Sequence, residues 1–196
     1  MFIGCQFSLY AMTNDYVELI LDAVKGLQAR EDLRVEADDL STLIVGPSAA
    51  MFEAVRNAFV TAAKSGEHVV ANVTFSRGCP GEPDDPLCTP EEPEAGGARL
   101  PDPRTTSKTG VTAAAQFAVY PLGISDYMNA IAEEIERSRE AGTFTGGKHF
   151  CSRLDDDCGP IFATLHAAFE KAGERAGHAV VTASVSANSP SGADQT

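Results

Sequence analysis

The sequence lacks tryptophan, has little positive charge and contains no long hydrophobic run. Its 15 Lys and Arg residues stand against 28 Asp and Glu residues, which gives a formal net charge of -13. A nucleic acid would meet net repulsion from this chain, and no stripe of basic residues compensates for it. No segment approaches the roughly 20 consecutive apolar residues that span a bilayer. These absences predict a protein with neither a nucleic-acid partner nor membrane insertion.

Signals of export and of metal binding are also missing. The first residues, Met1 to Cys5, lack the charged and apolar regions of a signal peptide, so we expect a cytoplasmic location. The five cysteines are odd in number and irregularly spaced, which is typical of a chain that does not depend on disulfides. Their spacings do not match a structural zinc site, and no glycine-rich phosphate loop surrounds Gly46. We therefore expect no metal and no cofactor.

The strongest positive signal is an internal repeat. The segment Gln6-Phe7-Ser8-Leu9-Tyr10 recurs 110 positions later as Gln116-Phe117-Ala118-Val119-Tyr120. The same offset relates further pairs, namely Phe52 and Phe162, Phe59 and Phe169, His68 and His178, and Ser76 and Ser186. Asp15-Tyr16 corresponds to Asp126-Tyr127 after a one-residue slip, which a loop insertion explains. Because a single offset relates aromatic residues and strand-end residues along the chain, the sequence predicts two copies of one structural unit.

Each copy changes its hydrophobic periodicity in the same order. In the first copy, period-two alternation at residues 5–10 and 69–76 predicts strands, and 33–38 and 41–45 form two short strands around a turn. Apolar stripes from Tyr16 to Leu27 and from Phe52 to Ala62 predict two helices, the second opened by Pro47. The second copy repeats this order, with helices near 126–140 and 160–175 and a last strand near 178–186. The predicted fold class is α+β, a tandem repeat of two ferredoxin-like βαββαβ units with antiparallel sheets.

Composition sets the expected boundaries between the copies. Seven of the eleven prolines lie between Pro80 and Pro103, together with several acidic residues. We therefore predict a first repeat over 1–80, an irregular linker over 81–110, a second repeat over 111–190 and a flexible tail over 191–196.

A polar face is expected on each sheet. The first and last strands of a ferredoxin-like unit are neighbours, so their outward side chains share one face of the sheet. In the first copy this face contains Gln6, Ser8, Tyr10, Asn72, Thr74 and Ser76, and in the second Gln116, Tyr120, Thr182, Ser184 and Ser186. Such groups can recognise the donor and acceptor edge of a heterocycle. From the residues alone, however, an outer face that simply meets water is favoured, because such faces are the norm in antiparallel sheets.

Three other features leave alternatives open. Cys79 could act as a nucleophile with His68 or His178, although no local signature supports this. The two histidines could instead make one shared backbone contact, or contact a ligand in both copies. The run Asp155-Asp156-Asp157 could bind a cation, or form a turn that caps the next helix, which we favour.

Several motifs resemble the YkoF family. In the first copy they are residues 4–10 (GCQFSLY) and 74–81 (TFSRGCPG), and in the second they are 116–122, 142–144, 152–155 and 186–191. The similarity covers nearly the whole chain outside the proline-rich linker. Ala11 departs from the family pattern, which more usually has proline there, as at Pro121 in the second copy.

The resemblance implies a tandem ferredoxin-like protein that dimerises and binds thiamine or hydroxymethylpyrimidine, with one site in each repeat. It also implies a non-enzymatic role in vitamin uptake or salvage beside a membrane transporter. Placed on the polar faces and family motifs, the expected ligand-binding residues are Gln6, Ser8, Tyr10, Ser41, Thr42, Asn72, Thr74, Gln116, Tyr120, Ser152, Asp155, Thr182 and Ser184. Asp38, Asp39 or Asp155 could balance the thiazolium cation. The alternatives are an enzyme acting on a thiamine-related pyrimidine with Cys79 as nucleophile, and a dimeric regulatory module.

Overall fold

A computed structural model of the chain describes residues 3–79 and 100–192. The first half contains β1 (Ile3–Ala11), α1 (Tyr16–Val24), β2 (Arg34–Ala37), β3 (Thr42–Val45), α2 (Ser48–Ala63) and β4 (Val69–Arg77). The second contains β5 (Thr112–Leu122), α3 (Tyr127–Glu140), β6 (Phe144–Lys148), β7 (Cys151–Asp157), α4 (Cys158–Arg175) and β8 (His178–Ala187), and it is followed by the short helix η2 (Pro190–Gly192). The predicted βαββαβ order is therefore confirmed in both halves.

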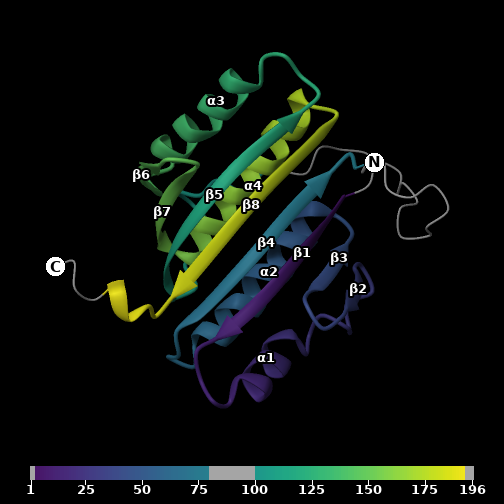
Figure 1. Cartoon of the computed structure of the whole chain (residues 1–196), viewed down its shortest axis with the longest axis vertical. Coiled ribbons are helices and arrows are strands. Elements are labelled where there is room, and N and C mark those ends of the chain that lie inside the picture. The colour runs from purple at the N-terminus through teal and green to yellow at the C-terminus, as the bar shows by residue number, and fades with distance from the viewer. Residues whose placement is uncertain (1–2, 80–99, 193–196) are drawn as a thin grey trace.

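In the described residues, the strands form one antiparallel sheet of eight strands in the order β2-β3-β1-β4-β8-β5-β7-β6. Within each half the order is that of a ferredoxin-like unit, with the first and last strands adjacent. The two units join edge to edge through β4 and β8, which run side by side across the middle of the molecule (Figure 1). This pairing covers the edge strand that each unit would otherwise expose.

The join has an internal two-fold relation. Val73 pairs with Ala183, and these two residues are also equivalent in the repeat, since they are 110 positions apart. Pairing then proceeds symmetrically in both directions, with Asn72 opposite Ser184 and Thr74 opposite Thr182. A pseudo-two-fold axis therefore passes between Val73 and Ala183.

The two repeated histidines lie at this join. The Nε2 atom of His68 is 3.0 Å from the Ser186 hydroxyl, and the Nε2 atom of His178 is 3.4 Å from the Ser76 hydroxyl. Each histidine thus contacts a serine of the other half. The sequence left open a shared backbone contact or a ligand contact, and the structure shows a third role, because these side chains link the two repeats.

The helices cover one face of the sheet. In Figure 1, α2 and α4 lie behind the central strands, while α1 and α3 flank them. Aromatic side chains fill the space under the join, where the ring of Phe52 stacks on Phe75 at 3.9 Å and on His166 at 4.5 Å between centroids. Beside them, Arg77 and Glu170 form an ion pair of 2.5 Å, in which both side chains are 16% exposed. Helix packing on this face leaves the other face of the central strands open.

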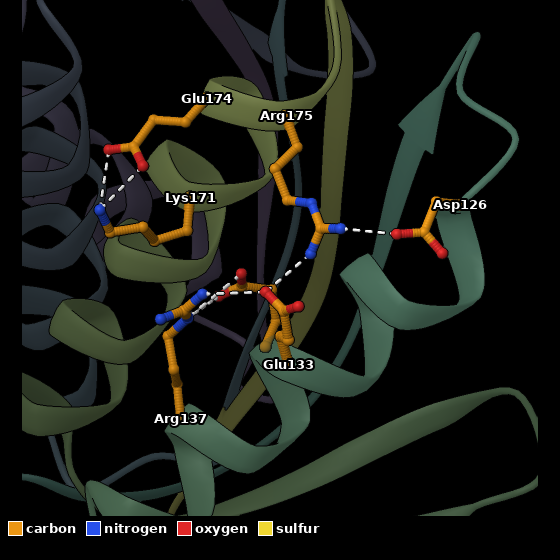
Figure 2. Close-up of polar contacts among 7 residues, drawn as sticks. Asp126, Glu133, Arg137, Lys171, Glu174 and Arg175 are labelled. Atoms are coloured by element: carbon orange, nitrogen blue, oxygen red, sulfur yellow. Dashed lines mark hydrogen bonds and ion pairs between the residues drawn. The ribbon is translucent and has the colours of Figure 1, made fainter.

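The second half has a polar contact between its helices (Figure 2). Arg175 on α4 lies 2.8 Å from Asp126 and 2.7 Å from Glu133, and Arg137 reaches Glu133 at 3.4 Å. Arg137 also pairs at 3.2 Å with Glu134, whose side chain is only 1% exposed. The two pairs of Arg175 join α4 to α3, whereas the pairs of Arg137 lie within α3. The exposed pairs among them contribute little individually.

Part of the predicted linker packs against the second half. The carboxylate of Asp157 accepts hydrogen bonds from the backbone amides of Thr109 at 2.8 Å and Gly110 at 2.7 Å, and it caps α4 through the amide of Gly159. The aspartate run was expected to form a turn that caps the next helix. It is instead the end of β7, but the expected capping is confirmed for Asp157. Residues 81–99 of the predicted linker and 193–196 of the predicted tail lie outside the described residues.

Candidate functional site

A groove of about 630 Å³ lies on the face of the sheet opposite the helices. Its floor consists of side chains from β1, β4, β8 and β5, and its walls come from the β2–β3 and β6–β7 turns. Both halves of the chain therefore contribute to one continuous groove. This arrangement follows from the β4–β8 join, which places the two polar faces side by side.

The floor consists of two rows of residues that each cross β1, β4, β8 and β5. Within a row, each residue is paired with the next one on the neighbouring strand. One row runs Ser8, Asn72, Ser184, Gln116, and the other runs Gln6, Thr74, Thr182, Ala118. The two-fold relation exchanges the rows, so that Gln6 corresponds to Gln116 and Ser8 to Ala118. Asn72 likewise corresponds to Thr182. The two ends of the groove thus have the same backbone and different chemistry.

Hydrogen bonds within the groove orient its polar groups. Ser184 donates to the Asn72 side-chain oxygen at 2.8 Å, which leaves the Asn72 amide nitrogen facing the groove as a donor. Gln6 Nε2 donates to the Ser41 hydroxyl at 2.8 Å, which leaves Gln6 Oε1 as an acceptor. Within residues 3–79 and 100–192, the hydroxyls of Thr74 and Thr182 make no side-chain hydrogen bond. The floor can therefore both donate and accept.

Apolar and aromatic groups line the sides of the groove. Tyr10 and Tyr120 are 49% and 46% exposed, so each ring has a free surface. Leu40 and Phe150, at equivalent turn positions, are 78% and 93% exposed and border opposite ends. Such rings can stack on a flat heterocycle or a cation.

The structure places ten of the thirteen predicted ligand-binding residues in this groove, namely Gln6, Ser8, Tyr10, Ser41, Asn72, Thr74, Gln116, Tyr120, Thr182 and Ser184. Leu40, Phe150 and Cys151 also line it, and sequence reasoning missed them. A signal was available, because Leu40-Ser41 and Phe150-Cys151 are related by the same offset of 110.

The other three predicted residues lie elsewhere. Ser152, expected to bind ligand in the second copy, is 6% exposed and lies on the same side of β7 as the buried Leu154, so it faces away from the groove. Thr42 opposes Phe7 and points toward the helix-facing side, where it borders a smaller cavity. Asp155 is held by Arg153, whose guanidinium lies 2.7 Å from the carboxylate. Strand alternation explains the first two, because neighbouring residues face opposite sides.

The smaller cavity adjoins the first-half end of the groove. It measures about 220 Å³, shares Ser8, Tyr10, Leu40 and Ser41 with the groove, and is also lined by Asp38 and Asp39. The Asp38 carboxylate accepts hydrogen bonds from the amides of Leu40 and Ser41, both at 2.8 Å. These bonds lower the pKa of Asp38 below its usual value. The first-half end is therefore acidic.

The nucleophile and the two histidines considered from the sequence lie outside the lining of the groove. Cys79 follows β4 and is not among the groove-lining residues, and both candidate histidines contact serines at the join. Burial raises the pKa of the Cys158 thiol to about 12, so that thiol stays protonated at neutral pH. In the described part of the chain, no group of three His, Cys, Asp or Glu side chains is placed to hold a metal ion. Among the same residues no helix is long and apolar enough to cross a membrane.

Comparison with known proteins adds two findings. A family model described as "YKOF-related Family" matches residues 2–82 and 112–192, one match in each half. A protein of Bacillus subtilis (strain 168) named "Putative HMP/thiamine-binding protein YkoF" is 35% identical over 188 residues, which cover 96% of this chain and 91% of that protein. The similarity therefore extends over both repeats and over the strands that form the groove.

Proposed function

Because the chain belongs to the YKOF-related family, we propose that it binds thiamine or its hydroxymethylpyrimidine moiety in the groove on the open face of the sheet. The observation that supports this most directly is the groove floor, where donors and acceptors from four strands lie beside two exposed tyrosines. The name of the Bacillus subtilis relative supports the same class of ligand. A volume of about 630 Å³ lies within the range of small-molecule sites.

The aminopyrimidine ring presents both ring-nitrogen acceptors and an exocyclic amino donor. In the first half, Gln6 Oε1 can accept from the amino group, while Asn72 and Thr74 can donate to ring nitrogens. In the second half, Gln116 and Thr182 would take the corresponding positions. Stacking of Tyr10 or Tyr120 on the ring contributes about 1 kcal/mol beyond the burial of area.

The positive charge of the thiazolium is best balanced at the first-half end. Asp38 and Asp39 border the cavity that adjoins the groove there. Asp155, the third carboxylate considered from the sequence, already pairs with Arg153 and accepts a hydrogen bond from the Thr145 hydroxyl. We therefore assign the counter-charge to the two aspartates of the β2–β3 turn.

Two ligands per chain agree with the symmetry of the groove. Each end has its own glutamine, tyrosine and turn residues, and the two-fold relation exchanges the ends. We propose one site in each repeat, with the two sites open to each other across the β4–β8 join.

The same proposal includes a non-enzymatic role and assembly with a second copy. The groove supplies recognition groups, and Cys79, the candidate nucleophile, lies outside its lining. Exposed Leu40, Phe150 and Tyr10 at its rim would be covered by a homodimer partner. A role in vitamin uptake or salvage beside a transporter follows from the family resemblance and completes the proposal.

The test is calorimetric titration with thiamine, hydroxymethylpyrimidine and thiamine phosphate, on the wild type and on Asn72→Leu. Leucine removes the Asn72 donor and leaves Ser184 without its acceptor, so affinity at the first-half site should fall about tenfold. Asn57→Leu on α2, at an exposed position, is the matched control and should bind as the wild type does. If Asn72→Leu keeps the affinity and stoichiometry of the wild type, this site assignment is wrong.

The enzymatic alternative is tested with the same ligands. Product formation by the wild type that Cys79→Ser abolishes would replace the binding function with catalysis. Saturable binding without turnover in both proteins supports the binder.

A further inference from the structure

The two turns that border the groove have opposite charge. The β2–β3 turn contains Asp38-Asp39 immediately before Leu40, and the β6–β7 segment has Lys148-His149 immediately before Phe150. These pairs are equivalent in the repeat, since each basic residue follows its acidic counterpart by 110 positions. The two turns therefore have equivalent backbone positions but side chains of opposite charge.

The pairing of the strands places both charged positions on the groove side. Lys148 is directly opposite Cys151 in the β6–β7 ladder, and directly opposed residues in antiparallel strands share a face. Cys151 lines the groove, so Lys148 lies on the groove face of the sheet. In the first half, the backbone amide of Asp38 donates a hydrogen bond to the carbonyl of Ser41. Ser41 also lines the groove, so Asp38 has the same position relative to the groove as Lys148.

Other charged side chains near the two turns do not cancel the difference in charge between them. In the second half, Asp155 is paired with Arg153 through bonds of 2.7 and 2.8 Å, so those two charges offset each other and Lys148 remains in excess. In the first half, Arg34 and Glu36 on β2 contribute one charge of each sign, and the two turn aspartates remain in excess. The acidic pair thus borders the cavity that adjoins one end of the groove, and the basic pair lies beside Cys151 at the other end.

We infer that the two ends of the groove select ligands of opposite charge, with the first-half end taking the cationic thiazolium compound and the second-half end taking a phosphate monoester of the pyrimidine. This inference rests on the proposed function. It adds an anion subsite beside Phe150, in which Lys148 is the specificity-determining residue and His149 a second donor. The net charge of -13 repels a phosphate elsewhere on the surface, so a preference for the ester requires this local positive charge.

The experiment compares two probes that differ only in the phosphate, hydroxymethylpyrimidine and its monophosphate. Calorimetric titration at low ionic strength gives the preference ratio, defined as the dissociation constant of the alcohol divided by that of the ester. Reversing the charge in Lys148→Glu should lower this ratio about fivefold or more, with the affinity for the alcohol unchanged. The converse variant, Asp39→Lys, should raise the ester affinity and weaken thiamine binding by similar factors.

Lys108→Glu is the matched control, because it makes the same change of net charge at an exposed position of the segment that packs near the start of α4. An unchanged ratio in Lys148→Glu, or an equal drop in Lys108→Glu, would overturn the anion subsite while leaving pyrimidine binding in place. If the wild type binds neither probe and no thiamine, the proposed function itself fails and this inference fails with it.

Discussion

The two halves of the molecule share one backbone plan but differ in the side chains that are buried on and next to their helices. In the first half, these are Ala23 and Ala54 on the helices and Leu27 just after α1. Their repeat equivalents in the second half are Glu134, Ser138 and Thr164, which are 1%, 0% and 4% exposed. A fold can therefore keep its register and its join while its interior changes from apolar to polar, provided that each polar group has a partner.

The partners in the second half are local. Ser138 donates to the Ile135 carbonyl at 2.6 Å, and Thr164 donates to the Pro160 carbonyl at 3.0 Å. Glu134 pairs with Arg137 on the next turn of α3. Burial raises the pKa of Glu134 to about 7, and Arg137 only partly opposes this shift. The buried carboxyl of Glu134 therefore makes the stability of the second half depend on pH.

A second difference between the halves lies just after the last strand of each unit. Gly78 and Asn188 are repeat equivalents, and both have left-handed backbones, with φ of 76° and 56°. A Cβ atom on Gly78 would lie 1.9 Å from the Gly177 carbonyl oxygen. At the equivalent place, Asn188 donates to the carbonyls of Ala63 and Glu67 at 2.8 and 2.9 Å. In the first half, Gly78 therefore packs closely against the neighbouring backbone, and in the second half the Asn188 side chain hydrogen bonds to it.

The largest expected effect comes from breaking the glycine contact. Gly78→Ala should lower the free energy of unfolding by about 4 kcal/mol, because it adds a backbone clash to a conformation that alanine disfavours. Asn188→Gly keeps the left-handed backbone and loses only two hydrogen bonds, so we expect about 1 kcal/mol. Urea denaturation measures both. Gly177→Ala, whose Cβ would meet no atom within 4 Å, is the control, and a loss in Gly78→Ala no larger than in that control would contradict the argument.

A smaller effect is expected from the buried acid. The folded-state pKa of Glu134 is raised from 4.5 to about 7, so the folded state binds a proton that the unfolded state releases. Stability from this group is therefore fully present below about pH 4.5 and is lost as the pH rises through 7. Relative to Glu134→Gln, the wild type should lose about 2 kcal/mol between pH 5 and pH 8. Denaturation curves across this range measure the difference.

Glu133→Gln provides the comparison for that prediction. Glu133 is on the same helix and pairs with Arg137 and Arg175, but its side chain is 49% exposed. Its removal leaves the buried Glu134 in place, so most of the loss of stability between pH 5 and pH 8 should remain in this variant. Identical slopes for the wild type and Glu134→Gln would show that the carboxyl of Glu134 titrates normally.

Much of this architecture could be predicted from the sequence, because the repeat and the strand alternation are local properties. The offset of 110 identified both units, and alternation placed Gln6, Ser8 and Asn72 on one face. The β4–β8 join could not be predicted, since either unit could have paired its free edge with other partners. The single groove is a consequence of that join. Periodicity therefore predicted the floor of each half but not that the two floors meet.

The errors at the site also have physical causes. Ser152 was expected to bind ligand in the second copy, but it is opposite Phe117 in the ladder and therefore faces the helices. Leu40 and Phe150 were missed because exposed apolar residues in short turns resemble ordinary surface residues until the fold shows which cavity they border. Glu134 was missed because an acidic residue on an amphipathic helix is expected to face solvent.

The smallest expected effect concerns the one floor position where the halves differ by a single hydroxyl. Ser8 donates to the Leu40 carbonyl at 2.7 Å and so anchors the acidic turn, whereas its equivalent Ala118 has no such group. Ser8→Ala should weaken thiamine binding at the first-half end about threefold, because the turn that holds Asp38 and Asp39 loses one tether. Ala118→Ser makes the opposite exchange and should leave that end unchanged, since it lies across the join. Calorimetric titration of both single variants and of the double variant with thiamine measures the effect. Equal losses of thiamine affinity in the two single variants would show that the ends of the groove are not independent.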